Sequence, residues 1–353
     1  MSNEPEKKKE SLNRSYGLGI FSTTTKLEQT FEENAVRYEY EEKTGLLISK
    51  WKGEKPSAEL RFPDGYFERS LENVGGGMVI TAKSGSDESF EFSSIVEKSG
   101  SDIIFIIAEE NSHLHIFETI IGESPVFFGR NLFVAVGKGA NVTFANTVSF
   151  LSESVFLSYH SARVSQNGKM EWHNLRSGAE MTRSLTEDIL AGKEAESSVY
   201  DMSLCSEGNF DVYNITHHKA DNTTSHILAR GIAGGGGKIV YRALSDIGEG
   251  VSGATSRQDG RFLIASSGAE IDAIPSLDIG SSESSSSHAL SISHLHDSDY
   301  FYPALRGINP YRAQAMLLSG FLSKPLEKLP PKWQTALLTS INKKLSSPMY
   351  RFE

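Results

Sequence analysis

The chain has 353 residues, of which 38% are hydrophobic and 23% charged, and a net charge of -10. This composition lies well outside the low-hydrophobicity regime of disordered proteins, so we expect the chain to fold around one large core or two ordinary ones. Acidic and basic residues are interspersed rather than collected in blocks, which argues against nucleic acid as the main partner.

The first 98 residues carry few strong patterns. Residues 1–15 include the charged run EPEKKKE and are predicted to form a disordered N-terminus. No apolar segment typical of a secretory signal follows this run, and the longest apolar run, Ile103–Ala108, is far too short to span a bilayer. We therefore expect a cytoplasmic protein without a membrane partner. Residues 16–98 mix strand-like runs with acidic, less periodic sequence and form a predicted mixed N-terminal region.

Residues 99–296 are organised by repetition. Segments of alternating polarity follow turn residues at near-constant steps of 28 to 31 residues. Their first residues form two series, Asn111, Gly139, Gly168 and then Gly178, Gly208, Gly237, Gly268. This period predicts a β-solenoid core, because each turn must bring the chain back to the same place one strand spacing further along. On periodicity alone, an antiparallel sandwich with strands every 8 to 12 residues, roughly, remains an alternative.

After His296 the sequence takes on helical spacing. Asn309 is a predicted N-cap with Pro310 at the first helical position, and Lys332–Leu345 is a second predicted helix. The fold class is therefore mainly β, with a C-terminal helical segment over residues 297–353.

The common catalytic motifs are missing from the sequence. GIAGGGGKIVYRA contains glycines and a lysine but not the GxxxxGK[ST] spacing that holds phosphates, and there is no GxSxG elbow. Cys205 is the only cysteine, which excludes an internal disulfide and an all-cysteine metal site. We expect it to be a small buried hydrophobic residue, and we expect the protein not to be an enzyme.

Histidines and acids support a weaker alternative, a metal-dependent or carbohydrate-active β-solenoid enzyme. His113 and His115 would face the same side of a strand as two metal ligands, although no third ligand is evident. His217 and His218 would face opposite sides, which disfavours chelation. Acids spaced through turns are usually solvated, but in a polysaccharide-cleaving β-helix they form a carboxylate cluster. The acids concerned are Glu180, Asp201, Asp211 and Asp221.

The stretch from Pro275 to Leu322 contains short motifs at fixed offsets. They are PSLDI from Pro275, then Ser286–His288, Phe301–Tyr302, Arg306–Ile308, Ala313 and Gly320–Leu322. This series resembles the SufB/SufD family of iron-sulfur cluster assembly scaffolds. Without gaps, it matches the family pattern P-x-L-x-I, C-S-H-G-A-T, F-Y, R-G-I, a downstream alanine and G-F-L. The resemblance is strongest over residues 268–330, and it implies a right-handed β-helix with helical ends.

The departures from the family pattern bear on cluster binding. The SufB branch has a cysteine where this chain has Asp259, and a glutamate where it has Ala289. The SufD-branch histidine is retained as His288, but the cysteine two residues earlier is Ser286. Serine is a poor ligand for iron, so this chain alone should hold no cluster tightly. The serine run before His288 is therefore interpreted as solenoid edge sequence that has lost its thiolate chemistry, not as a linker.

The resemblance implies a SufD-like scaffold that pairs through its solenoid edge with a SufB-like paralogue or with itself. His288 would then supply one nitrogen to a cofactor, an iron-sulfur cluster held transiently at the subunit interface. His294 and His296 match no family ligand and are expected to be solvent-exposed. A purely structural scaffold that has lost the cluster role is a further alternative.

The C-terminal helices carry the implied binding surface for a SufC-like ABC-type ATPase. Its predicted residues are Arg306, Gly307, Ala313, Leu317 and Phe321. A competing interpretation is that the same helices only cover the open end of the solenoid, as every β-helix must protect its last turn.

Overall fold

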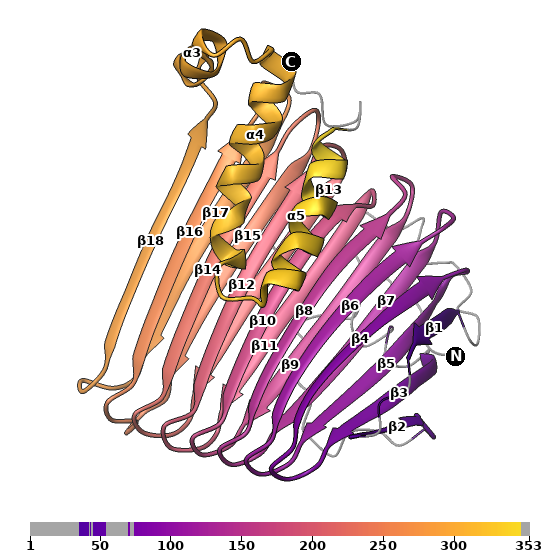
Figure 1. Ribbon diagram of the computed structural model, residues 1–353. Helices are drawn as coiled ribbons and strands as arrows, with labels where there is room; N and C mark the ends of the chain where they lie inside the picture. Colours follow the sequence, from indigo (N-terminus) through magenta and orange to yellow (C-terminus); the bar gives the residue numbers. More distant parts are fainter. Residues whose placement is uncertain (1–34, 42, 44, 54–69, 71–73, 347–353) are drawn as a thin grey trace, which may run out of the picture.

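The structure is a computed structural model that describes residues 35–41, 43, 45–53, 70 and 74–346. It is a β-solenoid of about 8 turns followed by three helices (Figure 1), which confirms the predicted fold class. Residues 1–15, predicted to be disordered, lie outside the described residues. Among the described residues, no helix is long and apolar enough to cross a membrane.

Two nine-stranded sheets form the walls of the solenoid, and each turn contributes one strand to each sheet. Sheet A consists of β1 (Val36–Tyr40), β4 (Asp87–Val96), β6 (His113–Gly122), β8 (Asn141–Phe150), β10 (Lys169–Gly178), β12 (Glu196–Cys205), β14 (Thr224–Ala233), β16 (Thr255–Ile264) and β18 (Ser285–His294). Sheet B consists of β2 (Leu46–Lys50), β3 (Val74–Ala82), β5 (Gly100–Ala108), β7 (Phe127–Val136), β9 (Val155–Val164), β11 (Met181–Leu190), β13 (Asn209–His218), β15 (Lys238–Ile247) and β17 (Glu270–Ile279).

The strand register explains the sequence repeat. His113, Asn141 and Lys169 begin β6, β8 and β10 and lie side by side in parallel strands. One predicted step is thus one turn of the solenoid, and the parallel pairing rules out the antiparallel sandwich. The predicted core began at residue 99. In the structure, parallel pairing begins earlier, between β3 and β5, so the solenoid includes strands upstream of residue 99.

Alternate residues of each strand point into the space between the sheets. Trp172, Val199 and Ile227 occupy one inward column on β10, β12 and β14, and each is at most 1% exposed. Because one turn cannot bury its apolar face alone, these columns of stacked apolar side chains stabilise the whole solenoid.

The turns from sheet B back to sheet A need a residue in the left-handed region. Asparagine and glycine, which tolerate this region, stand there at Asn111, Gly139, Asn167, Asn222 and Gly253. At Gly139, a Cβ atom would lie 2.4 Å from Asn111 Oδ1 of the preceding turn. A side chain at position 139 would therefore have to displace the Asn111 side chain, so this turn favours glycine.

The C-terminal helices are α3 (Asp297–Leu305), α4 (Pro310–Ser323), η1 (Lys324–Leu326) and α5 (Pro331–Leu345). Asn309 caps α4, because its Oδ1 accepts a hydrogen bond from the Arg312 backbone N–H at 2.9 Å, and Pro310 is the first helical residue. Both features confirm the prediction, and the predicted second helix matches α5 to within one residue.

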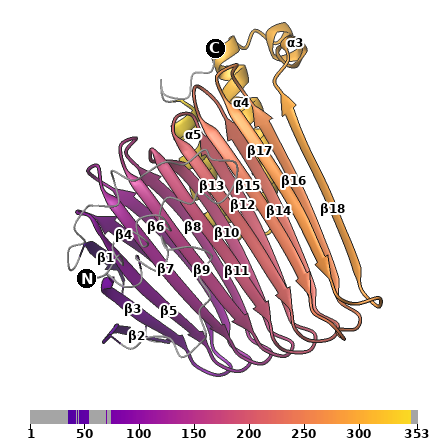
Figure 2. The same ribbon diagram turned by 180° about the vertical axis from the view of Figure 1, so that it is seen from behind.

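Helices α4 and α5 lie across the outer face of sheet A (Figure 1), and they lie behind the strands in the reverse view (Figure 2). Trp333 of α5 packs 5.5 Å from Phe117 of β6, measured between ring centroids, and its Nε1 donates to Glu91 of β4 at 2.8 Å. The rest of this interface includes Leu175, Met202 and Ile232 of sheet A and Leu318, Leu322, Leu337 and Ile341 of the helices. The helices therefore cover a face of the solenoid, and the interpretation that they cap its open end is wrong.

Candidate functional site

The last turn of the solenoid, formed by β17 and β18, is open. No described strand pairs with the outer edge of either strand. Phe262 of β16 is 2% exposed, whereas Ile292, its in-register neighbour on β18, is 41% exposed. On β17, Ile279 is 44% exposed, whereas its in-register neighbour Ile247 on β15 is 1% exposed. Apolar positions that are buried one turn earlier are thus exposed in the last turn, whose strands β17 and β18 lie at one end of the solenoid (Figure 1).

The serine run belongs to this last turn. Ser286 points inward on β18 and lies in register with Ser256 and Ser225 of the two preceding turns. Ser225 Oγ donates to Ser256 Oγ at 2.9 Å, and Ser256 Oγ donates to Ser245 of β15 at 2.6 Å. The run therefore continues a hydroxyl column of the interior, which confirms that it is edge sequence of the solenoid and not a linker.

His288 stands at the mouth of the open turn. It lies in register with the buried Gln258, whose Nε2 donates to Ser245 Oγ across the interior at 2.8 Å. His288 itself is exposed, and its ring makes no hydrogen bond to another described residue. An inward-facing imidazole at an open edge is accessible to a group brought by a second subunit.

The other family ligand positions do not converge on His288. Asp259 and Ala289 lie next to each other in register on the outer face of sheet A, whereas Ser286 and His288 face inward. Asp259 Oδ1 accepts a hydrogen bond from Arg230 Nη1 at 2.8 Å. Among the described residues, no group of three or more His, Cys, Asp or Glu side chains is placed to hold a metal ion.

Part of the predicted docking segment forms an exposed aromatic surface. Arg306 lies 5.2 Å from the centroid of the Tyr302 ring, and its Nη2 donates to the Tyr302 hydroxyl at 2.9 Å. We call Phe301, Tyr302, Leu305 and Arg306 the α3 patch; its three apolar members are 64% to 69% exposed. Gly307 is exposed beside it with a φ of 70°.

The remaining predicted docking residues face the sheet to different degrees. Ala313 is 1% exposed and so belongs to the helix–sheet packing, while Leu317 and Phe321 are half-buried. Phe321 packs against the helix–sheet core. The sequence reasoning did not single out Phe301 and Leu305 as surface residues, although two aromatic residues and a leucine one turn later on a helix are the signal that could have found them.

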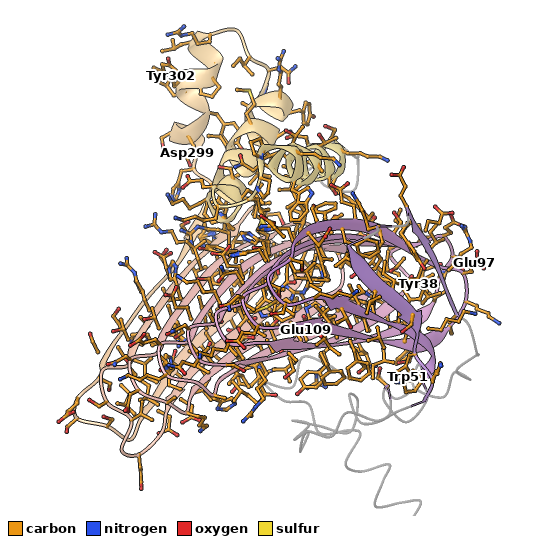
Figure 3. The ribbon with its side chains drawn as sticks, turned by 60° about the horizontal axis from the view of Figure 1, so that its bottom comes forward. Tyr38, Trp51, Glu97, Glu109, Asp299 and Tyr302 are labelled. Carbon is orange, nitrogen blue, oxygen red and sulfur yellow. The ribbon has the colours of Figure 1, made fainter. Side chains whose placement is uncertain are left out.

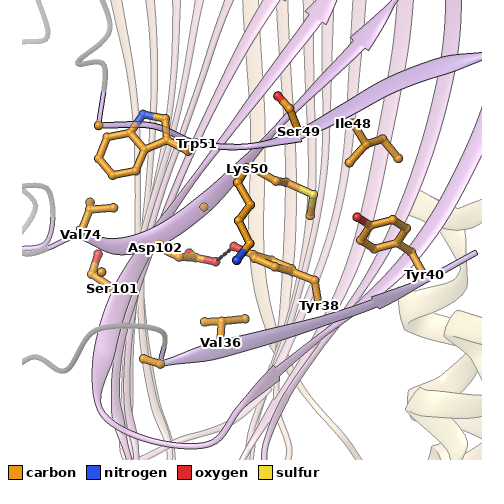
Figure 4. A pocket seen from close by; sticks show the side chains of 16 residues that line it. Val36, Tyr38, Tyr40, Ile48, Ser49, Lys50, Trp51, Val74, Ser101 and Asp102 are labelled. Atoms are coloured by element: carbon orange, nitrogen blue, oxygen red, sulfur yellow. Dashed lines mark hydrogen bonds between the residues drawn. The ribbon is translucent and has the colours of Figure 1, made fainter. Parts of the chain in front are cut away.

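The N-terminal end of the solenoid is built differently. β1 and β2 pair antiparallel with β4 and β3 and cover the first parallel strands. A cleft of about 440 Å³ remains between them (Figure 4). At its floor the Tyr38 hydroxyl donates to Asp102, and behind Asp102 lies the fully buried Arg130.

Arg130 holds together a buried ionic network. Its Nε donates to Asp102 Oδ1 at 2.7 Å, and its Nη1 donates to Glu118. Burial opposes the charge of Arg130, but the two carboxylates outweigh this effect and raise the pKa of the guanidinium. Burial and the neighbouring Asp102 raise the pKa of Tyr38, which therefore stays a neutral donor.

The acids do not form a catalytic cluster. Asp201 and Asp211 are each 1% exposed, so the expectation that they are solvated is wrong. Asp201 points inward and accepts two hydrogen bonds from Arg176 Nη1, both at 2.8 Å, whereas Asp211 lies on the outer face of sheet B next to Arg242. Glu180 and Asp221 are exposed, as expected. Asp201 is paired with an arginine in the interior, where the sheets exclude water and an unpaired charge would be costly.

The histidine pairs are explained by packing and hydrogen bonding. His113 and His115 share the outer face of β6. His113 Nδ1 lies within hydrogen-bonding distance, 3.0 Å, of Asn141 Nδ2, and the ring of His115 packs against that of Trp333. His217 and His218 face opposite sides, as predicted. His217 lies 3.0 Å from Glu187 and 2.6 Å from Asp246.

The four titratable side chains of His217, Cys205, His294 and His296 differ in their surroundings. Burial opposes the charged form of His217, but its two carboxylate partners outweigh burial and raise its pKa. Burial raises the pKa of Cys205 to about 12, so its thiol stays protonated and unreactive, as expected for a buried cysteine. His294 and His296 are exposed.

These features define a β-solenoid protein with one protected end and one open end that carries an inward-facing histidine. Comparison with known families makes this class specific. Residues 95–321 match the family described as SUF system FeS cluster assembly, SufBD core domain, and the chain belongs to this family.

Curated relatives agree with the family match. The chain is 28% identical over 234 residues to an iron-sulfur cluster assembly SufBD family protein of Staphylococcus aureus (strain MRSA252), and equally so to one of Staphylococcus epidermidis (strain ATCC 12228 / FDA PCI 1200). Each match covers 65% of this chain and 50% of the relative. The chain thus spans about half the length of the curated relatives it matches.

Proposed function

We propose that this chain is a SufD-like, cytoplasmic scaffold subunit of iron-sulfur cluster assembly that performs no catalysis itself. The observation that carries the proposal is the open last turn, where the inward column changes from a buried Phe262 to an exposed Ile292. An exposed sheet edge with apolar side chains is a template for pairing with another chain. Family membership supports the iron-sulfur cluster as the cargo.

The second subunit is a SufB-like paralogue or another copy of this chain. Ser286 and Asp259 replace the thiolates of the family, so the partner has to supply the sulfur ligands of the cluster. His288, which faces inward at the mouth, would contribute one nitrogen. The cluster is then held only at the subunit interface, and the chain alone holds none.

Sedimentation velocity of the chain, alone and mixed with a SufB-like scaffold, tests the pairing. We expect a dimer in at least one of the two samples, and we expect Ile292→Glu to abolish it because the new charge would be buried at the interface. Ile121→Glu is the matched control, since Ile121 is 37% exposed far from the last turn. A monomer in both samples, or equal behaviour of the two variants, contradicts the proposal.

His288→Ala separates a cluster scaffold from a purely structural one. If the cluster forms at the interface, the variant should still pair but carry less iron and less cluster absorbance after anaerobic co-purification with the partner. Unchanged iron content would support the purely structural scaffold. His294→Ala is the control, because His294 is exposed on the same strand.

We further propose that the α3 patch binds an ABC-type ATPase. The Arg306 guanidinium is already held over Tyr302, so little side-chain entropy is lost when it meets a partner carboxylate. Exposed aromatic and arginine side chains are typical anchors of protein interfaces.

Point substitutions test this docking better than truncation, because removing α4 and α5 would expose the apolar outer face of sheet A. Leu305→Ala and Tyr302→Ala should weaken binding of the ATPase at least about tenfold, as is typical of interface anchors, with the melting temperature unchanged. Leu151→Ala is the control, because Leu151 is 46% exposed in the turn after β8. Equal affinity of all three variants would exclude the α3 patch as the docking site.

A further inference from the structure

The middle turns of the solenoid contain two polar columns that face each other. On sheet A, Asn146, Asn174 and Asp201 follow one another in register on β8, β10 and β12. On sheet B, the opposite column includes Thr186 and Asn214 on β11 and β13. Asn214 Nδ2 donates to Asp201 Oδ2 across the interior at 3.4 Å. Asn174 and Thr186 stand one turn earlier in these columns and therefore also face each other.

Many polar atoms in these columns and at the adjacent inward positions have no protein partner. All belong to side chains that are at most 2% exposed, and none makes a hydrogen bond to a described residue. The atoms are Asn146 Oδ1, His160 Nδ1, both amide atoms of Asn174, Arg176 Nη2, Ser184 Oγ, Thr186 Oγ1 and Asn214 Oδ1. Native proteins leave few buried polar atoms unpaired, so such a cluster in adjacent turns points to a ligand.

Asn174 and Thr186 face each other across the interior without bonding to each other. One turn later, Asn214 and Asp201 do form a hydrogen bond across the interior. The ring of His160, in register with Thr186, stacks on Trp172 of the neighbouring level at 5.3 Å between ring centroids. The unpaired polar atoms therefore lie beside stacked aromatic rings.

The unpaired atoms include both donors and acceptors. Arg176 Nη2 and Asn174 Nδ2 donate, whereas Asn146 Oδ1 and Asn214 Oδ1 accept. Burial and the nearby Arg176 hold the pKa of His160 well below its usual range, so its ring is neutral. His160 Nε2 lies 3.1 Å from Ser158 Oγ, which leaves Nδ1 as an acceptor if Nε2 carries the proton.

We propose that the interior of the middle turns is a binding site for a cluster of ordered water molecules, held between Asn146, Asn174, Thr186 and Asn214. Water is the ligand that fits, because it donates and accepts at the same site. An ion fits less well, because the nearest charge, Arg176, is already paired with Asp201 at 2.8 Å. The site does not depend on the proposed function, so either can fail alone.

Thr186→Val tests the site through the sign of its effect. The two side chains have nearly the same shape, so the substitution removes the hydroxyl and little else. If Thr186 bonds to water, the variant should melt roughly 2 °C lower because that hydrogen bond is lost. If the interior is dry, the variant should melt higher, because an unpaired hydroxyl has been removed, and the proposal is overturned.

Two further variants calibrate the test. Thr223→Val removes a hydroxyl that donates to Ala220 O at 3.0 Å and contacts His218 Nδ1, so it should lower the melting temperature in either case. Thr255→Val changes an exposed threonine and should leave it unchanged. If Thr186→Val changes the melting temperature no more than Thr255→Val does, the proposal is overturned.

A crystal structure of the unmodified chain gives a readout that does not depend on any variant. We expect ordered water within hydrogen-bonding distance of Asn174 and Thr186 in well-resolved density. Side chains that instead turn to bond each other, or an ion or organic molecule at this position, would overturn the proposal.

Discussion

The two ends of the solenoid differ in whether the chain covers their strand edges and their last layer of core side chains. Each end of a β-solenoid exposes strand edges and one unpaired layer of core side chains. At the N-terminal end, antiparallel β1 and β2 cover the first strands, and Tyr38 and Arg130 join an internal ionic network. At the C-terminal end, Ile292 and His288 face solvent. The chain thus covers one end with its own strands and leaves the edges at the other end unpaired among the described residues, as the proposed pairing requires.

The protected end can be seen in the side-chain view (Figure 3), where Tyr38 and Trp51 lie around the first strands and α3, with Tyr302, extends at the far end of the molecule. The α3 patch is therefore near the open turn rather than the protected one. Both proposed contact surfaces belong to the same end of the solenoid.

The largest expected effect comes from breaking the protected end. Arg130→Met would leave the carboxylates of Asp102 and Glu118 buried without their cation, both at most 2% exposed. Breaking a buried ion pair from one side typically costs about 3–5 kcal/mol. We expect a loss of this size in the free energy of unfolding, measured by urea denaturation at neutral pH.

Arg261→Met is the matched control for this change. Arg261 lies on the outer face of β16 with its side chain 62% exposed and 3.8 Å from Asp259. Exposed pairs contribute little, so this variant should stay within about 0.5 kcal/mol of the unmodified chain. Similar losses in the two variants would mean that the network does not hold the N-terminal end together.

A buried acid without a cation should make the middle turns sensitive to pH. Asp188 accepts hydrogen bonds from Trp172 Nε1 at 2.9 Å and from Ser197, and burial raises its pKa to about 7. The native state therefore keeps a proton that the unfolded chain releases near its ordinary pKa of 3.8. Stability should fall as the pH rises from about 4 to about 7, by at most about 4 kcal/mol.

Urea unfolding of the unmodified chain and of Asp188→Asn between pH 4.5 and 8, approximately, measures this slope. Other titrating groups contribute equally to both proteins, so the difference between them isolates Asp188. The free energy of unfolding of Asp188→Asn, relative to that of the unmodified chain, should increase as the pH rises. A difference that does not change with pH would show that Asp188 is ionised in the native state and would contradict this prediction.

The fold was predictable because its main signals are local and periodic. Turn residues such as Asn111 and Gly139 recur at the spacing of one turn, and Asn309 with Pro310 marks the start of a helix. The course of the helices was not predictable. Their packing across sheet A depends on contacts such as Trp333 with Phe117, which are distant in sequence and leave no spacing signal.

The candidate site was predictable only in part. His288 could be singled out by its family pattern, and the alternation of β18 placed it on the same face as Ser286. The ionic network could not be derived, because a single arginine in the apolar run FFGRNLFVAV gives no indication of which acids pair with it. The burial of Asp201 was missed for the same reason.

Phe262 and Ile292 are neighbours in one inward column of sheet A, one enclosed and one exposed. Phe262 is the last fully enclosed member of its column; its ring lies 4.9 Å from that of Tyr241, measured between centroids. It also fills the space over Gly231 of β14, where a Cβ atom would lie 2.6 Å from Phe262 Cδ1. Phe262→Ala should therefore cost about 3 kcal/mol in the free energy of unfolding, at any protein concentration.

The next member of this column, Ile292, should behave in the opposite way if the last turn is open. It is 41% exposed, so Ile292→Ala should cost less than about 1 kcal/mol in the monomer, because little buried area is lost. Association would bury Ile292 and stabilise the folded state by mass action. The melting temperature of the unmodified chain should then rise with its concentration, or with added SufB-like scaffold, and that of the variant should rise less. If Ile292→Ala already costs as much as Phe262→Ala in dilute monomer, the last turn is closed within the chain, and the two ends do not differ in the way that the proposed pairing requires.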